Sequence, residues 1–406
     1  MVDAPLGRRR SRFRLRADGD EIRHLLGAPA GRLLVLTVAG IAALTLAGLA
    51  ALWPYGWDGL GAARTGTVPA TVERVSDTPC SEGAGVRCRA IDVTVEGRRA
   101  TVSLGPVRNA PAVAGGDAVR LLRGGRTDVE PPAGQPVHYE FAEVDRRGSL
   151  IWLALVMAVV AAAALRWRGV LAVLGVGLSL AVVLWFLVPA ILAGRPALLV
   201  ALVASLLVMF VTLILTNGLG MQTLAAALGI SATLVLTCAL AFGAVRFADL
   251  DGTSELDMLA LKAGTDILSL QGVVLAAMVI GTLGVLADTA VTQASAVMAL
   301  RRANPRYGAL DLHREALTIG RDHLSATIHT LVLAYAGATL PLLLVLQTGG
   351  VASADAINGQ SIATPIVATI VGCLALIAAV PITTGLASLV LARLPAAVVP
   401  DAHHHH

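Results

Sequence analysis

One apolar run, from Val273 to Leu300, is long enough to cross a lipid bilayer as a helix that rises about 1.5 Å per residue. This run contains one carboxylate, that of Asp288. A charged side chain near the middle of a bilayer costs at least about 2.5–3.5 kcal/mol, so it is expected to face protein or water rather than lipid. The run therefore predicts both a membrane span and a polar site within it.

The composition extends the membrane prediction to the whole chain. Of its 406 residues, 56 % are hydrophobic and 14 % are charged, whereas a soluble chain carries about 25 % charged residues. The formal net charge is only +4, and arginines gather beside apolar runs, at 8–16, at 166–168 and at 301–306. Such a distribution fits the positive-inside rule better than a nucleic-acid surface. We expect a lipid bilayer as partner and no nucleic acid.

About eight membrane-spanning helices are expected. A basic cytoplasmic tail at 1–31 precedes the first span, 32–54, which we interpret as an uncleaved anchor because no convincing cleavage site follows it. A seven-helix domain occupies 148–394, and 395–406 is a tail that ends in a histidine tag. The seven spans are expected near 150–165, 169–192, 197–215, 222–245, 270–300, 322–347 and 361–392. The loop arginines place both termini on the cytoplasmic side.

Residues 55–147 have a different pattern, in which apolar and polar residues alternate in short runs separated by Gly, Pro and Asn. Period-two alternation is typical of half-buried strands. Five or six such strands predict a small extracytoplasmic β-barrel of the oligonucleotide/oligosaccharide-binding (OB) type between helices 1 and 2. Cys80 and Cys88 lie in this domain. A disulfide is the favoured interpretation, and two reduced thiols in a cytoplasmic domain are the alternative.

Short segments recur in order along the membrane domain. Leu174-Gly175-Val176 returns as Leu283-Gly284-Val285, and Pro196 returns as Pro305. The matches predict two three-helix units, 169–245 and 270–392, inverted relative to one another, which is a recurring plan in transporters. Chance similarity among Leu, Val and Gly is the alternative explanation.

Two polar stripes stand out within the spans. Asp288, Thr292 and Ser295 share one helix face, and Gln293 lies beside them; Asp322, Ser325 and His329 share one face of the next helix. If both stripes begin near the cytoplasmic surface, Asp288 and His329 reach a similar depth, so we expect them to face a common polar cavity. A histidine that titrates near neutrality beside a carboxylate could bind and release a proton or a cation. The alternative is a structural polar pair that joins two helices.

Arg321 and His323 flank Asp322 at the expected start of a span. They admit two interpretations: Asp322 favours the helix N-terminus while Arg321 lies among headgroups, or the three form an intracellular gate or coupling group. We find no Walker A loop and none of the hydrolase or Cys/His metal motifs. We therefore expect no enzymatic activity and no cofactor; the sequence does not tell whether a metal binds.

Four segments carry a family resemblance: Gly281-x-Leu-Gly-x-x-x-Asp288-x-Ala-x-x-x-Ala-Ser295, Asn304-Pro305, Gly320-Arg-Asp-His323 and Thr330-Leu-Val-Leu-Ala-Tyr-x-Gly337. With them the chain resembles the bacterial YibE/F-like membrane proteins over roughly 55–392. The resemblance implies a predicted permease in a bacterial cytoplasmic membrane, with no defined substrate and no assigned site residues.

The first functional hypothesis is a secondary transporter of a small ion or solute, coupled to protons through Asp288 and His329. An ion channel lined by the same stripes is the second hypothesis. A non-transporting envelope protein that binds a partner through its β domain is the third. A homodimer is compatible with all three.

Overall fold

The computed structural model describes residues 25–56, 67–80, 86–123, 139–253, 269–348 and 353–394. Most of the expected basic tail, most of the acidic loop that follows Asp251 and the C-terminal tail lie outside these residues. The chain divides into two compact units, one made of 1–57 with 170–406 and the other of 58–169. Each unit is described by itself.

Among the described residues, eight helices are long and apolar enough to cross a membrane, as the sequence predicts. Between α4 and α5 one span contains a π-helical segment, η1. The helices are α2 (Pro29–Leu52), α3 (Arg147–Leu165), α4 (Trp167–Val182) continued by η1 (Val183–Leu187) and α5 (Val188–Leu192), α6 (Ala197–Asn217), α7 (Met221–Phe247), α9 (Leu270–Ala303), α10 (Ala309–Thr348), the short α11 (Ser353–Asn358) and α12 (Gln360–Ala392).

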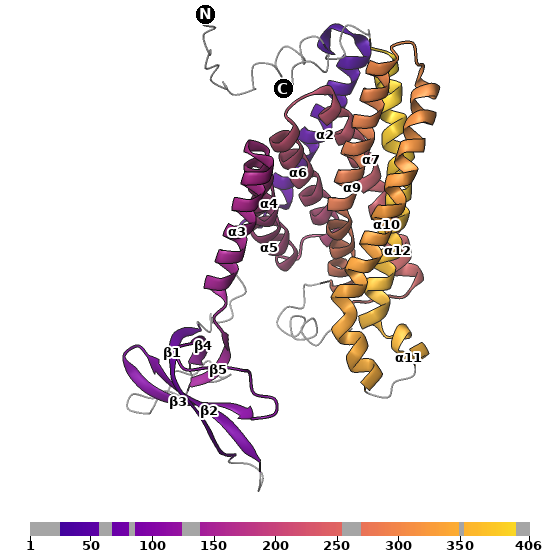
Figure 1. Cartoon of the computed structure of the whole chain (residues 1–406). Coiled ribbons are helices and arrows are strands. Elements are labelled where there is room, and N and C mark those ends of the chain that lie inside the picture. Colours follow the sequence, from indigo (N-terminus) through magenta and orange to yellow (C-terminus); the bar gives the residue numbers. More distant parts are fainter. Residues whose placement is uncertain are drawn as a thin grey trace, which may run out of the picture. The chain divides into compact units, whose positions relative to one another are not determined.

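The centre of the helical unit is formed by α7, α9 and α12, which pack against one another (Figure 1). Small residues permit the close approach. A Cβ atom added to Gly229 of α7 would lie 2.7 Å from Cγ2 of Thr383 on α12, and one added to Gly372 of α12 would lie 3.0 Å from Cγ2 of Thr282 on α9. α10 packs on α9 and α12, α6 packs on α9 and α7, and α2 packs on α6 and α7.

The predicted start of the seventh span was wrong. α10 begins at Ala309, about three and a half turns before the expected position near residue 322. The acidic residue of its first turn is Asp311. Asp322 lies inside a continuous helix, so it cannot act on the helix N-terminus, and that interpretation of Asp322 is dropped.

The two helical halves do not pack alike. In the second half, α9 contacts both α10 and α12 and also reaches α6 and α7 of the first half. In the first half, the corresponding first helix makes only limited contacts, with α6 through η1 and α5. The packing therefore does not establish an inverted repeat.

The β unit contains a five-stranded antiparallel sheet, with strand order β3-β2-β1-β4-β5. The long first strand pairs with β2 along most of its length and with β4 at its start, and its pairing with β2 shifts register between Val72 and Arg74. Alternate residues, including Val72, Ile91, Val93 and Leu121, form its core. The strands are β1 (Val68–Pro79), β2 (Arg87–Val95), β3 (Arg98–Pro106), β4 (Ala118–Arg123) and β5 (Tyr139–Val144).

The edge strands β3 and β5 contact each other, which makes the sheet curled. No β3–β5 hydrogen-bond ladder closes it among the described residues. The predicted strands are thus confirmed, and a closed OB-type barrel is not established.

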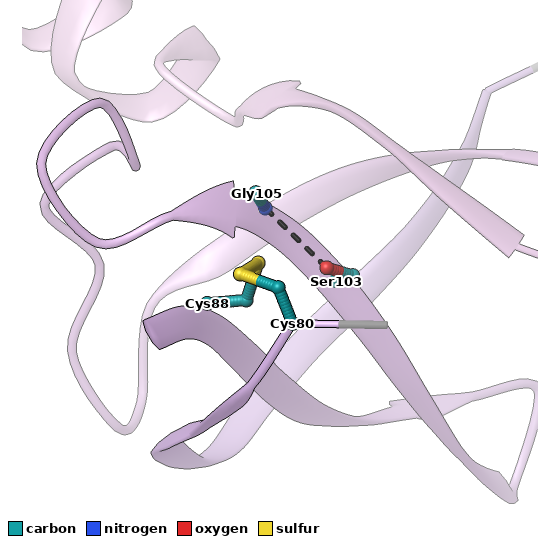
Figure 2. Close-up of a disulfide and its surroundings, with 4 residues drawn as sticks. All are labelled: Cys80, Cys88, Ser103 and Gly105. Atoms are coloured by element: carbon teal, nitrogen blue, oxygen red, sulfur yellow. Dashed lines mark hydrogen bonds between the residues drawn. A yellow bond between two sulfur atoms is a disulfide. The ribbon is translucent and has the colours of Figure 1, made fainter. Parts of the chain in front are cut away.

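A disulfide joins Cys80 and Cys88, as predicted, with their Cα atoms 5.0 Å apart (Figure 2). It links the end of β1 to the start of β2, where the Cys80 amide also donates to the Val86 carbonyl at 3.0 Å. On neighbouring β3, the Gly105 amide donates to Ser103 Oγ at 3.4 Å. The other two cysteines are free; Cys238 is buried and Cys373 is half-buried.

Candidate functional site

Asp288 lies near the middle of α9 and meets a histidine of α10. Its Oδ2 atom is 3.5 Å from Nε2 of His323, and 68 % of the Asp288 side chain and 36 % of the His323 side chain are exposed. Asp288 is therefore at the surface of the helical unit where α9 and α10 adjoin, whereas the His323 nitrogen that it meets is buried. The pair is a carboxylate–imidazole contact that brings together two of the predicted site residues.

The register of the two antiparallel helices explains this pairing. Gly281 lies opposite Tyr335, and Gln293 lies opposite Gly320. On this register His329 falls about one turn beyond Asp288, near the level of Gly284. Nδ1 of His329 contacts the Ser325 carbonyl of its own helix at 2.7 Å. The structure thus brings Asp288 to His323, and His329 makes its contact within α10.

The stripe of Asp322, Ser325 and His329 is exposed throughout, and Arg321 beside it is exposed as well. The opposite side of α10 carries Gly320, whose position is fixed by contacts with α9 and α12. The stripe consequently points away from the helical core.

Gln293 belongs to a different environment, because its side chain is fully buried. Its Oε1 atom accepts a hydrogen bond from Thr384 Oγ1 of α12 at 2.8 Å. Gly320 makes room for this amide, since a Cβ atom there would lie 2.7 Å from Nε2 of Gln293. Three helices thus meet in one buried polar layer.

Several polar atoms around this layer have no hydrogen-bond partner within the described part of the chain. They include Nε2 of Gln293 and the hydroxyl oxygens of Thr289, Thr383 and Ser388. Buried polar groups are usually satisfied, so each such group calls for an explanation, an ordered water or an ion among them.

Ser295 and Thr292 continue the α9 stripe toward its C-terminal end, and both are half-buried. Ser295 Oγ accepts a hydrogen bond from Gln222 Nε2 at the start of α7 and donates to the Val291 carbonyl at 2.7 Å. The predicted polar face of α9 is therefore divided: Asp288 is exposed, whereas Gln293 and Ser295 join α9 to its neighbours.

Arg301 is a buried cation that the sequence arguments missed as a site residue. Its guanidinium donates to the carbonyls of Pro305 and Tyr307, each at 2.7 Å, and to that of Leu394 at 3.3 Å. These acceptors lie in the α9–α10 loop and just beyond α12. The run of arginines suggested only a topology signal, because a buried arginine cannot be told from an interfacial one by position alone.

At the opposite end of the bundle, the side chain of Gln360 at the start of α12 donates to Asp251 Oδ1 at 2.7 Å. The same oxygen accepts from the amide and the hydroxyl of Thr253, at 2.9 and 2.7 Å. These hydrogen bonds lower the pKa of Asp251 from 3.8 to about 2, and those from Thr253 contribute most. The loop after α7 is thereby tied to α12.

No group of three His, Cys, Asp or Glu side chains within the described ranges is placed to hold a metal ion. An apolar cavity of about 210 Å³ lies between α2, α6 and α7, and one of about 260 Å³ adjoins the α5–α6 turn. Asp288 and His323 line neither cavity. What the site offers chemically is an exchangeable proton or a cation contact shared between two helices.

Comparison with curated proteins and with solved structures finds no match. A family model does match: that of the YibE/F-like proteins, over residues 153–393. These residues run from α3 to the end of α12 and include every residue of the helical site, and the match covers more than half of the chain. The chain therefore belongs to the YibE/F-like protein family.

Proposed function

We propose that the protein is a secondary transporter of a small ion or solute, coupled to protons through Asp288 and His323. The observation that carries the proposal is the 3.5 Å contact between these two side chains near the middle of a membrane-length helix. Ionisable residues within membrane spans are costly and usually mark a substrate pathway or a proton relay.

The chemistry follows from the two protonation states of the pair. When His323 carries a proton, it is an imidazolium that attracts the Asp288 carboxylate and holds α9 and α10 together at this point. When the proton leaves, the attraction weakens and the carboxylate can bind a cation or take up a proton itself. Two states that differ in this contact can differ in which side of the membrane the site faces.

Three further features support the proposal without testing it. The Cys80–Cys88 disulfide favours an oxidising compartment for the β unit, hence an extracytoplasmic position with both termini in the cytoplasm. The curled sheet is compatible with an OB-type barrel. The recurring segments in the two helical halves are compatible with an inverted repeat.

The test is transport by purified protein in liposomes that contain a trapped pH dye. A panel of cations, anions and small solutes is added to wild type, Asp288→Asn and His323→Gln. Glu315→Gln is the matched control, because it removes a carboxylate from the same helical pair, on the exposed surface of α10 two turns before His323. We expect one solute to drive proton movement in wild type and in the control, and in neither site variant.

Other results would point to the remaining functions. Solute flux that persists without proton movement in all four proteins would favour a channel. If no protein moves any solute, the helical site is not a transport site and the ligand of the β unit becomes the question.

A further inference from the structure

The exposed face of α9 is unusual for a membrane span. This helix is described over its whole length, and none of its large apolar side chains is exposed. Along the first two-thirds of the helix the exposed residues are Ala277, Gly281, Gly284 and Asp288, which follow one another at helical spacing on one face. Beyond them only Ala299, Arg302 and Ala303 are exposed.

The adjoining face of α10 is also polar or small near its middle. Asp322, Ser325, Ala326, His329 and Thr330 are all exposed there. Together the two helices present a surface that carries carboxylates, histidines and small residues. Lipid tails offer no hydrogen bonds and no counter-charge, so such a surface is covered by protein or water in a membrane.

We propose that a second copy of this chain covers the face, in a symmetric dimer in which α9 and α10 of the two copies pack together. The charges favour a second copy, because the face carries the acidic residues Asp288 and Asp322 beside the basic residue Arg321. A symmetric interface needs a surface that is complementary to itself. Small residues also allow helices in a bilayer to approach closely, and the space beside Gly284 is open, with no atom within 4 Å of an added Cβ.

The depth of each residue in the membrane predicts one specific contact between the two copies. When a two-fold axis runs along the membrane normal, each residue lies at the same depth in both copies. Ser325 is level with Asp288 on the observed register, and His329 lies about one turn away. Asp288 of one copy is therefore within reach of His329 of the partner subunit. In the dimer the carboxylate would have a histidine on each side, His323 from its own chain and the partner's His329.

Disulfide cross-linking of the full chain in membranes tests the contact. Gly284→Cys and Ser325→Cys place thiols on the face, and Val235→Cys places one on an exposed part of α7, 59 % exposed in the native residue. After oxidation we expect linked dimers to predominate for Gly284→Cys and Ser325→Cys. Wild type, which keeps Cys238 and Cys373, and Val235→Cys should remain monomeric on a denaturing gel.

A second measurement keeps the test independent of thiol chemistry. Subunits are counted by single-molecule photobleaching in liposomes, for Gly284→Leu and for Gly243→Leu. Both glycines are open to added bulk, Gly284 on the proposed interface and Gly243 on α7. We expect Gly284→Leu to shift the protein to monomers and Gly243→Leu to remain dimeric.

Three outcomes would overturn the proposal. The first is a wild-type protein that is monomeric in liposomes. The second is linking at Val235 that equals linking at Gly284. The third is a monomer in which Gly284→Cys is protected from water-soluble thiol reagents, which would mean that another part of the same chain covers the face. Transport can be intact in each case, so loss of the dimer and loss of the proposed function are distinguished.

Discussion

α2 and α9 belong to the same helical unit and have similar mean hydropathies, 2.4 and 2.1 over their most apolar windows. Their exposed faces nevertheless differ. α2 exposes Leu33, Leu36, Leu44 and Leu46, each by more than half of its surface. α9 exposes only small, acidic or basic residues. Apolarity summed along a span therefore does not tell which surface the lipid covers, whereas the size of the exposed side chains does.

The largest effect should come from placing a charge on the face of α2. Leu36 is 67 % exposed, and if lipid covers it, Leu36→Asp should cost about 2.5–3.5 kcal/mol of insertion free energy. The first span would then fail to insert in a large fraction of molecules, while the other seven spans keep the chain in the membrane; protease accessibility of the residues that flank α2 measures that fraction. Leu36→Ala, which removes bulk and adds no charge, is the control and should insert normally. If Leu36→Asp inserts normally, lipid does not cover this face of α2, and α2 and α9 would not differ in lipid exposure.

A buried and an exposed position can also be compared within one helix, α7. Gly229 and Gly243 both belong to α7, but only Gly229 is in tight contact, with Thr383 of α12. Gly229→Leu overpacks the core and should lower the free energy of unfolding by about 1–3 kcal/mol, with a fall in Tm. Gly243→Leu should leave Tm near that of wild type. Equal Tm values for the two variants in detergent would show that α7 and α12 do not pack as described.

The buried side of α9 should show a smaller, paired effect. The Gln293–Thr384 hydrogen bond joins α9 to α12, and such bonds between membrane helices contribute about 0.6–1 kcal/mol. A double-mutant cycle with Gln293→Leu and Thr384→Val, read from unfolding free energies, should give a coupling of that size. Ser388→Ala is the reference, since Ser388 lies one turn further along α12. Additive effects of the two substitutions would mean that the bond contributes nothing.

The smallest effect concerns the loop that ties α7 to α12. Because the pKa of Asp251 is lowered to about 2, its hydrogen bonds stabilise the folded state fully above its ordinary value of 3.8 and lose this effect as pH falls toward 2. Asp251→Asn should lower Tm by on the order of 1–2 °C at neutral pH. The difference from wild type should shrink below about pH 4.

The sequence predicted the spans well because hydropathy and length alone determine them. It missed the start of α10, since residues 309–321 carry Asp311, Arg314 and Glu315 and read as a loop, while the structure continues the helix through them. The two polar stripes were found by helical spacing. Which stripe residue meets which could not be found that way, because a shift of between one and two turns between α9 and α10 exchanges His329 for His323 as the neighbour of Asp288.

The exposure of the site was also beyond the sequence. Spacing shows that Asp322, Ser325 and His329 share a face, but not that Gly320 turns the opposite face toward α9 and α12. The buried layer of Gln293 and Thr384 combines residues from helices far apart in the chain, and no local pattern marks such a pair.

The hydrogen bonds of Arg301 limit how α9 and α12 can move relative to one another. The contacts of Thr282, Gln293 and Arg301 with successively later parts of α12 and the residue beyond it show that α9 and α12 run parallel. Arg301 fastens them at one end, and Gln360 fastens α12 to the loop that leads into α9 at the other. Because these two parallel helices are held at both ends, we expect them to resist sliding and to move as one rigid body. If the protein alternates between inward and outward states, as proposed, the elements around these two helices would have to carry the motion.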